Sequence, residues 1–335
     1  MLSYLTYNHS FLTPIVSFWN DVFRGYRHFM PLETYVFRTR IVEQLAFDPQ
    51  GLILALDKNR VVGMVHAFRA ASHSYFVYRE NPCGRNGSIA LLAVAREYRH
   101  RGIGKELLKR AEGYLNTCLE KGSFIFAGEY WVPLYHTLEG PRQPFWGDTE
   151  IIGIAENNKD CIGFLEHHGY MTVGDEGQEI TMVAPLRTLD EVPKIPLRDY
   201  GLREVRIGED EPWEGRIDWY PAEERGNGYA RFGEFLQEGI ALVRGDTVTA
   251  HLLWYPMRKG GHVALWDLRV SADEQGKGLG SYLLDRSLWT MAQKGYHTVE
   301  LHTNTERNAK AVAMYRRRDF SIVERWVGLR KRVAD

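Results

Sequence analysis

The sequence predicts an α/β protein built from two related units in tandem. Its 335 residues are enough for two domains of roughly 100 to 200 residues each, and 44% hydrophobic with 25% charged residues is an ordinary globular composition. An apolar strand, a glycine-containing loop and an amphipathic helix follow one another once in each half. Three prolines in residues 185–196 indicate a linker between the halves. We therefore expect an N-terminal domain at 1–189 and a C-terminal domain at 190–335.

The first copy of this layout lies between residues 52 and 127. Residues 89–94 form a continuous apolar run typical of a buried strand, and residues 99–104 form the loop. Apolar residues then recur at helical spacing over 107–115. Alternating runs within 52–67 predict a hairpin before the strand, and 124–127 predicts a further strand after the helix.

The second copy repeats these features in the same order. Residues 263–270 are the expected strand, 275–280 the loop and 283–292 the helix, which Gly295 would end as a C′ residue. A hairpin within 240–254 and a strand at 298–303 flank it, as in the first copy. In both halves a final helix follows, ending near residues 168–170 and 318–320.

Charge and composition exclude several classes of function. Lysine and arginine number 42 against 43 acidic residues, so no net charge draws the whole chain to nucleic acid or to anionic lipid. The sequence contains no run of 18 apolar residues, which a membrane span would need, and its N-terminus lacks a basic, apolar leader. We therefore expect a cytoplasmic protein. Three widely spaced cysteines, Cys83, Cys118 and Cys161, fit neither a disulfide framework nor a zinc site. His100, His167 and His168 lack partners at metal-ligand spacing, so no metal is expected.

A glycine-rich turn between a strand and a helix collects main-chain amides and the positive end of a helix dipole, which suits a phosphate or pyrophosphate. A nucleotide P-loop requires a glycine where Arg99 stands and a serine or threonine where Glu106 stands. A dinucleotide fingerprint requires a third glycine where the chain has Leu107 and Leu283. Both alternatives fail.

The remaining pattern, Arg/Gln-x-x-Gly-x-Gly five residues after a strand-ending valine, occurs in both copies. It resembles the acetyl-coenzyme A (acetyl-CoA) loop of the GNAT superfamily of N-acetyltransferases. The resemblance implies two GNAT-like domains, each a mixed, mostly antiparallel sheet flanked by helices. It also implies cofactor contacts from Val94, Arg99, Gly102, Gly104 and Lys105 in the first copy, and from Leu268, Arg269, Val270, Gln275, Gly276, Lys277, Gly278, Leu279, Gly280, Ser281 and Asn308 in the second.

The final helix distinguishes the two copies. In the GNAT family this helix carries an asparagine that meets the pantetheine arm and, seven residues later, a tyrosine near the sulfur; here these are Asn308 and Tyr315. A phenol with an ordinary pKa near 10 can protonate a departing thiolate, so Tyr315 is the expected general acid. The first copy has Asn158 and Leu165 at these positions. We expect the C-terminal domain to be catalytic and the N-terminal domain to be degenerate.

The sequence does not single out the general base. The alternating positions on the strand before the second loop hold Ala264 and Trp266, which accept no proton. Period-two geometry would turn Asp267 to the opposite face, as a structural or binding carboxylate, and Glu300 on the next strand is another candidate. Deprotonation through ordered water is a further alternative.

The expected function is acetyl transfer from acetyl-CoA to a primary amine of a small molecule or peptide, directly within a ternary complex. The alternative is a non-enzymatic acyl-CoA binding or sensing module.

The acidic segment 209–224 has two interpretations: it could border a site for a cationic acceptor or, more simply, it could be part of the solvated surface. The aromatic segment 129–149 is expected to pack on the other domain or to line a pocket. The basic run 316–318 is expected on a solvated face. Some arginines of this run, together with Lys277, are candidates to contact the phosphates of the cofactor. We expect no nucleic-acid or membrane partner.

Overall fold

The chain forms two compact units that exchange segments. The computed structural model describes residues 2–43, 47–69, 86–128, 135, 149, 153–173, 177–187, 191–195, 198–207, 237–257 and 259–333. Unit 1 comprises Met1–Glu139, Ile151–Asp175 and Trp326–Asp335, and unit 2 comprises Gly140–Glu150 and Glu176–Arg325. Cys83, the acidic segment and most of the aromatic segment lie outside the described residues. Among the helices that are described, none has the length and apolar character needed to cross a membrane.

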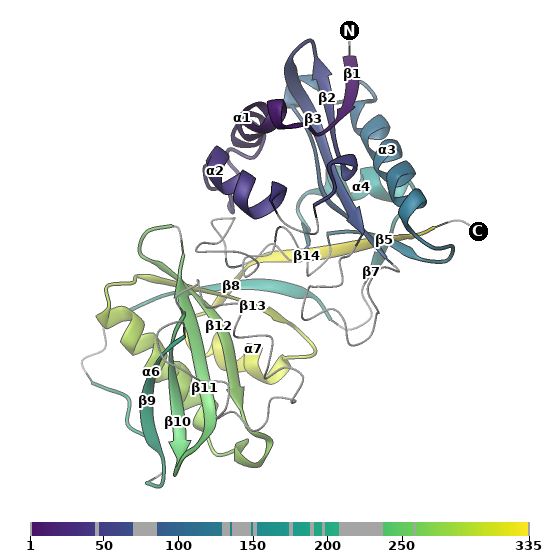
Figure 1. Ribbon diagram of the computed structural model, residues 1–335. Helices are drawn as coiled ribbons and strands as arrows, with labels where there is room; N and C mark the ends of the chain where they lie inside the picture. The colour runs from purple at the N-terminus through teal and green to yellow at the C-terminus, as the bar shows by residue number, and fades with distance from the viewer. Residues whose placement is uncertain are drawn as a thin grey trace. The chain divides into compact units, whose positions relative to one another are not determined.

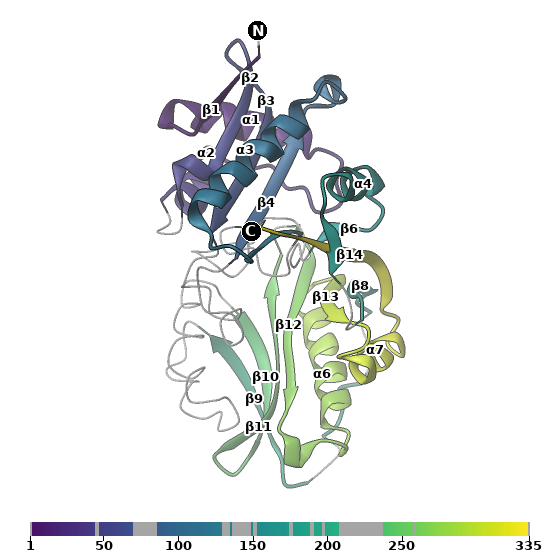
Figure 2. The same ribbon diagram turned by 90° about the vertical axis from the view of Figure 1, so that its right-hand side faces the viewer.

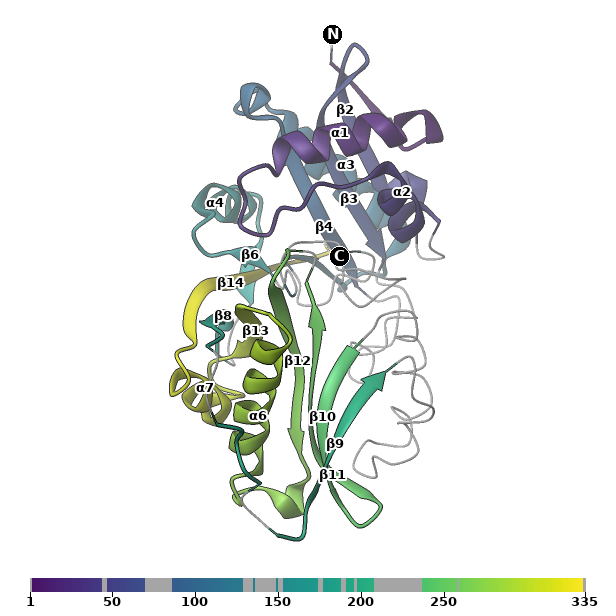
Figure 3. The same ribbon diagram turned by 90° about the vertical axis from the view of Figure 1, so that its left-hand side faces the viewer.

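Unit 1 is a mixed sheet with helices on both faces. Its strand order is β1-β2-β3-β4-β5 and then the C-terminal part of β14; only β4 and β5 run parallel. Helices α1 and α2 cover one face, and α3 and α4 cover the other (Figures 1 and 3). The elements are β1 (Leu2–Thr6), α1 (Leu12–Val22), α2 (Thr34–Phe37), β2 (Leu52–Asp57), β3 (Arg60–Arg69), β4 (Gly87–Val94), α3 (Ile103–Cys118), β5 (Phe124–Ala127), β6 (Ile154–Ala155), α4 (Lys159–His167) and β7 (Met171–Val173), with short 3₁₀ or π turns at His9–Phe11, Arg38–Val42, Pro49–Gly51 and Arg96–Tyr98.

Unit 2 repeats this sheet. Its order is β9-β10-β11-β12-β13-β8, with β14 next to β8, and β12 and β13 are the parallel pair. Helices α6 and α7 lie on the same face (Figure 2). The elements are β8 (Glu179–Pro185), β9 (Gly201–Ile207), β10 (Gln237–Arg244), β11 (Thr247–Pro256), β12 (His262–Val270), a 3₁₀ turn (Ala272–Glu274), α6 (Leu279–Gln293), β13 (Thr298–Asn304), α7 (Ala309–Arg316) and β14 (Ser321–Arg332). The predicted α/β class and mixed, mostly antiparallel sheets are confirmed.

The apolar periodicity read from the sequence corresponds to buried helix faces. Leu283, Leu284 and Met291 of α6 are fully buried against β11, β12 and β13. Leu107 and Leu115 of α3 are fully buried in the same way in unit 1. Burying each such side chain stabilises the fold by roughly 1.5–3 kcal/mol, so this packing holds each helix and its preceding loop against the sheet.

The last strand of each half lies in the sheet of the other half's unit. Strand β8 belongs to the first half of the chain but pairs antiparallel with β13 of unit 2, from Thr298↔Pro185 to Asn304↔Glu179. The end of β14, from Leu329 to Arg332, pairs with β5 of unit 1. The chain therefore passes between the two compact units near residues 140, 151, 176 and 326, whereas the expected linker lies near residue 190. Local patterns predict a strand but not the sheet edge that it joins.

Both units have an open wedge between their two central parallel strands. Pairing of β4 with β5 stops at Ile89↔Ala127, and pairing of β12 with β13 stops at Ala264↔Glu300. Among the described residues, β4 and β12 continue for several residues beyond the ends of these two parallel ladders. The wedge opens directly before the glycine loops.

Candidate functional site

The loop of unit 2 presents uncapped amides at the start of α6. Gly276 and Gly278 have φ angles of +80° and +82°, a left-handed conformation that glycine adopts without strain. Gly278 is the N-cap of α6 and no side chain caps the helix; the first closing bond runs from Tyr282 N to Gly278 O at 3.0 Å. In the described part of the chain, the amides of residues 279–281 are thus left for an anion. A cofactor diphosphate fits this cradle.

The Arg or Gln that opens each loop has the same structural task in both units. Gln275 Nε2 donates to the carbonyl of Val270 at 3.2 Å, and Arg99 Nε donates to the carbonyl of Val94 at 3.1 Å. Each bond ties the loop to the last residue of the preceding strand. These hydrogen bonds explain the constant spacing of five residues between the valine and the Arg or Gln in both copies.

Lys277 is directed toward a buried carboxylate. Its ammonium donates to Glu274 Oε2 at 2.7 Å, Arg244 pairs with Oε1 at 2.8 Å, and the Tyr200 hydroxyl also donates to this carboxylate. Glu274 is 2% exposed. Hydrogen bonds from Lys277 and Tyr200 lower the pKa of Glu274, and the bond to Glu274 raises the pKa of Lys277. Glu274 thus connects Lys277 and the loop to Arg244 at the end of β10.

The strand residues expected to meet the cofactor line the wedge. Leu268, Arg269 and Val270 pair on one side with β11, at Leu252, His251 and Ala250, and have no pairing with β13 on the other. In the part of the chain that the structure describes, the β12–β13 ladder stops at Ala264↔Glu300, so residues 268–270 border the wedge. In unit 1, Val94 ends the matching stretch of β4.

Asn308 and Tyr315 occupy opposite ends of α7. Asn308 is the N-cap residue, and its side chain makes no capping bond, whereas Asn158 of unit 1 accepts from Cys161 N at 3.3 Å. Tyr315 is 6% exposed and packs on Phe320. Burial, and then the negative charge of Asp267, raise the pKa of Tyr315. Leu165 stands at the corresponding place in unit 1.

Asp267 does not face the side that simple alternation predicted. A register shift in β12 leaves Trp266 as an extra residue between Leu265, opposite Trp254, and Asp267, opposite Leu253. Leu253 packs in a cluster that includes Trp266, on the face away from α6. Asp267 therefore shares a face with Trp266, because the bulge cancels one step of the alternation.

Asp267 contacts side chains of both β11 and β12 on that face. His251, fully buried, lies with Nε2 2.7 Å from Asp267 Oδ2, and Arg269 Nε donates to Oδ1 at 3.1 Å. The carboxylate itself remains 18% exposed. Sequence reasoning missed His251, because nothing local indicates that a residue on β11 meets one on β12. An Asp–His pair that reaches solvent beside the wedge can accept a proton.

Glu300, the other candidate base, is enclosed. It lies at the vertex of the wedge, is 3% exposed, and accepts from Thr149 N at 3.0 Å and from Thr149 Oγ1 at 3.3 Å. The Tyr255 hydroxyl donates to Thr149 O at 2.8 Å. Thr149 comes from the aromatic segment of the first half, so that segment contributes to unit 2. These contacts favour a structural role for Glu300.

The loop of unit 1 has the same shape with different chemistry. Gly102 has φ +79° and caps α3, but the position of Gly276 is held by His100 at φ +60°. The ring of Phe164 from α4 lies 3.6 Å from the point where a Cβ on Gly104 would stand. Lys105, in the first turn of α3, stands where unit 2 has Ser281.

Comparison with known proteins decides the family. The profile of the acetyltransferase (GNAT) family matches residues 16–127 and 202–320, more than half of the chain. The chain belongs to the GNAT acetyltransferase family. It is an acyltransferase of a family that uses acetyl-CoA and acts on amine acceptors. A sequence search of curated proteins finds no match.

Solved structures share the tandem fold at low sequence identity. A tandem GNAT protein from the clavulanic acid biosynthesis pathway, solved without acetyl-CoA, has a TM-score of 0.70 at 16% identity, covering all of both chains. A GCN5-related N-acetyltransferase from Sphaerobacter thermophilus has a TM-score of 0.60 at 14% identity, covering 100% of this chain and 97% of that one. A glucosamine N-acetyltransferase region of a fungal multi-domain beta-N-acetylglucosaminidase has a TM-score of 0.64 at 15% identity, covering 98% of this chain and 38% of that one.

Proposed function

We propose that unit 2 transfers the acetyl group of acetyl-CoA directly to a primary amine of a small molecule or a peptide. The observation that carries this proposal is the combination of a free-amide cradle, an open wedge and a buried tyrosine in one unit. When bound, acetyl-CoA would supply an activated thioester. The amides of residues 276–281 would hold its diphosphate, and residues 268–270, where β12 borders the wedge, would hold its arm together with Asn308.

Tyr315 is the proposed general acid. Burial and the charge of Asp267 keep its phenol protonated at neutral pH, which is the form that can give a proton to a departing thiolate. Leu165, at the corresponding position of unit 1, has no proton to give. We therefore assign catalysis to unit 2 and regard unit 1 as its degenerate copy.

Asp267 is the proposed proton acceptor for the amine. The amine would approach on the face of the sheet that carries Trp266 and Asp267, because α6 and α7 cover the other face. His251 orients the carboxylate and can share the proton across the 2.7 Å contact. The proposed base is thus a pair, Asp267 on β12 and His251 on β11, and the sequence alone did not indicate this pair.

The test is acetyl transfer itself. The full chain is incubated with acetyl-CoA and a panel of small primary amines and peptides, and thiol release is followed with acetylated product. Amine-dependent release supports the proposal. Tight binding of acetyl-CoA without thiol release in the presence of any amine would instead indicate an acyl-CoA binding or sensing module.

A further inference from the structure

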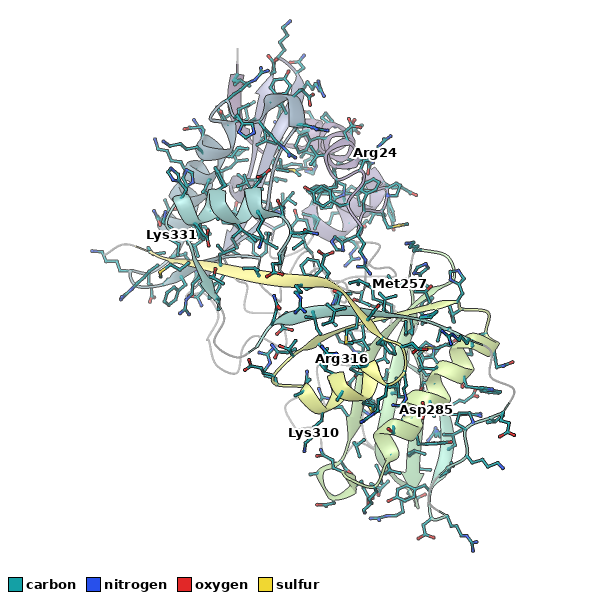
Figure 4. The ribbon with its side chains drawn as sticks, turned by 180° about the vertical axis from the view of Figure 1, so that it is seen from behind. Arg24, Met257, Asp285, Lys310, Arg316 and Lys331 are labelled. Carbon is teal, nitrogen blue, oxygen red and sulfur yellow. The ribbon has the colours of Figure 1, made fainter. Side chains whose placement is uncertain are left out.

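Arg318 joins the two helices of unit 2. The sequence placed it in a basic run on a solvated face, and its neighbours Arg316 and Arg317 are exposed as expected. The Arg318 side chain is only 16% exposed. Figure 4 labels Asp285 on α6 and Arg316 at the end of the neighbouring α7.

The Arg318 guanidinium makes five hydrogen bonds to both helices. Nε and Nη2 donate to Asp285 Oδ1 and Oδ2 at 2.5 and 2.7 Å, a bidentate ion pair. Nη2 also donates to Ser281 O at 3.2 Å and to Ser281 Oγ at 3.1 Å, in the first turn of α6. Nη1 donates to Met314 O at 3.1 Å, in the last turn of α7. The planar fork of arginine suits this geometry, and lysine cannot reproduce it.

These hydrogen bonds connect the amide cradle with the turn of α7 that carries the proposed acid. Ser281 is the last residue of the amide cradle, and Met314 directly precedes Tyr315. We propose that Arg318, held by Asp285, is a positioning residue that fixes the proposed acid Tyr315 relative to the diphosphate cradle. This inference rests on the proposed function of unit 2.

Unit 1 lacks the whole arrangement. His168 stands where unit 2 has Arg318, and Lys105 and Lys109 stand where it has Ser281 and Asp285. His168 Nδ1 lies 2.7 Å from Phe164 O within its own helix turn. The connection is present in the unit that has the tyrosine and absent from the unit that lacks it.

The first test separates positioning from binding. Arg318→Lys should lower kcat for amine acetylation about tenfold while changing the Kd for CoA less than about threefold, since the cradle amides remain. Asp285→Asn should behave in the same way, and Arg317→Lys is the matched control with no effect. In a Tyr315→Phe background, Arg318→Lys should cause no further loss of kcat. An equal further loss there, or a CoA affinity that falls as much as kcat, would overturn the proposal.

The second test needs no acceptor. 3′-Phosphoadenosine 5′-diphosphate, the nucleotide half of CoA, lacks the pantetheine arm and would reach only the cradle. In the wild-type chain it should slow amide hydrogen exchange at 276–281 and, through Arg318, in α7. In Arg318→Lys it should slow exchange only at 276–281.

The outcomes of the second test are distinguishable from failure of the proposed function. Wild-type protein that binds the nucleotide but shows no slowing in α7 contradicts the positioning role alone. A cradle that does not bind the nucleotide, in a chain that also shows no turnover with any amine, contradicts both proposals. Turnover without binding at the cradle would leave acetyl transfer standing and remove the role of Arg318.

Discussion

At the scale of single residues, Tyr315 should determine the rate and not the affinity. Tyr315→Phe keeps the ring that packs on Phe320 but removes the proton, so we expect kcat to fall about 100-fold with little change in the Kd for CoA. Tyr282→Phe, another tyrosine of the same core, is the control. Steady-state kinetics and calorimetry measure the two quantities, and unchanged turnover would remove Tyr315 as the acid.

Asp267 should matter most when the acceptor amine is protonated before it attacks the thioester. Asp267→Asn should lower kcat about 100-fold for an alkyl amine, with a much smaller loss for an aromatic amine that is already neutral at pH 7. Asp246→Asn, on the exposed turn of the β10–β11 hairpin, should have no effect. Comparable losses with both amines would assign Asp267 a structural role instead.

These residues also mark the limit of reading a site from a sequence. Glycine spacing was sufficient to place the loop, and helical spacing was sufficient to place Asn308 and Tyr315 on one helix. The predicted sheet face of Asp267 was wrong, because a bulge adds one residue to the strand without changing its composition or hydropathy. His251 and Thr149 enter through contacts between distant parts of the chain, which no local pattern encodes.

At the scale of elements, the two glycine loops offer a matched comparison. Gly278 and Gly102 are both helix N-caps with positive φ, and neither has an atom within 4 Å of its Cβ position. Alanine in this conformation costs about 1–2 kcal/mol, so we expect Gly278→Ala to disturb the cradle and weaken CoA binding about tenfold. Gly102→Ala should leave turnover unchanged. If Gly102→Ala reduced turnover and Gly278→Ala did not, unit 1 would be the active copy.

The buried Glu274 gives the second loop a pH-dependent brace. Because its pKa is lowered in the folded state, its contribution to stability is complete above its unfolded value and is lost as pH falls through the folded value. Glu274→Gln should therefore lower the Tm at about pH 7 and lower it by a smaller amount at about pH 3, which is below the ordinary pKa of a glutamate. Asp273→Asn, the exposed neighbour, is the control. An equal loss of Tm at both pH values would contradict this account.

At the scale of the whole molecule, the exchange of terminal strands makes the two halves of the chain depend on each other. Leu329, which is fully buried, completes the core of unit 1 from the far end of the chain, and Met182 of β8 does the same for unit 2. The compositional linker at 185–196 therefore follows a strand that already belongs to the second unit.

A split at this linker should show the dependence directly. The half 190–335 lacks β8 and would expose the edge of β13, including the buried residues Val299 and Leu301; the half 1–189 lacks the strand that pairs with β5. An unpaired apolar edge favours aggregation, so we expect each half alone to be insoluble or unfolded and the co-expressed halves to associate. As the matched control, a chain with an added flexible linker at residue 190 but no break should fold normally. Size-exclusion chromatography and circular dichroism test this, and a folded, monomeric half 190–335 would mean that β8 is not needed for unit 2.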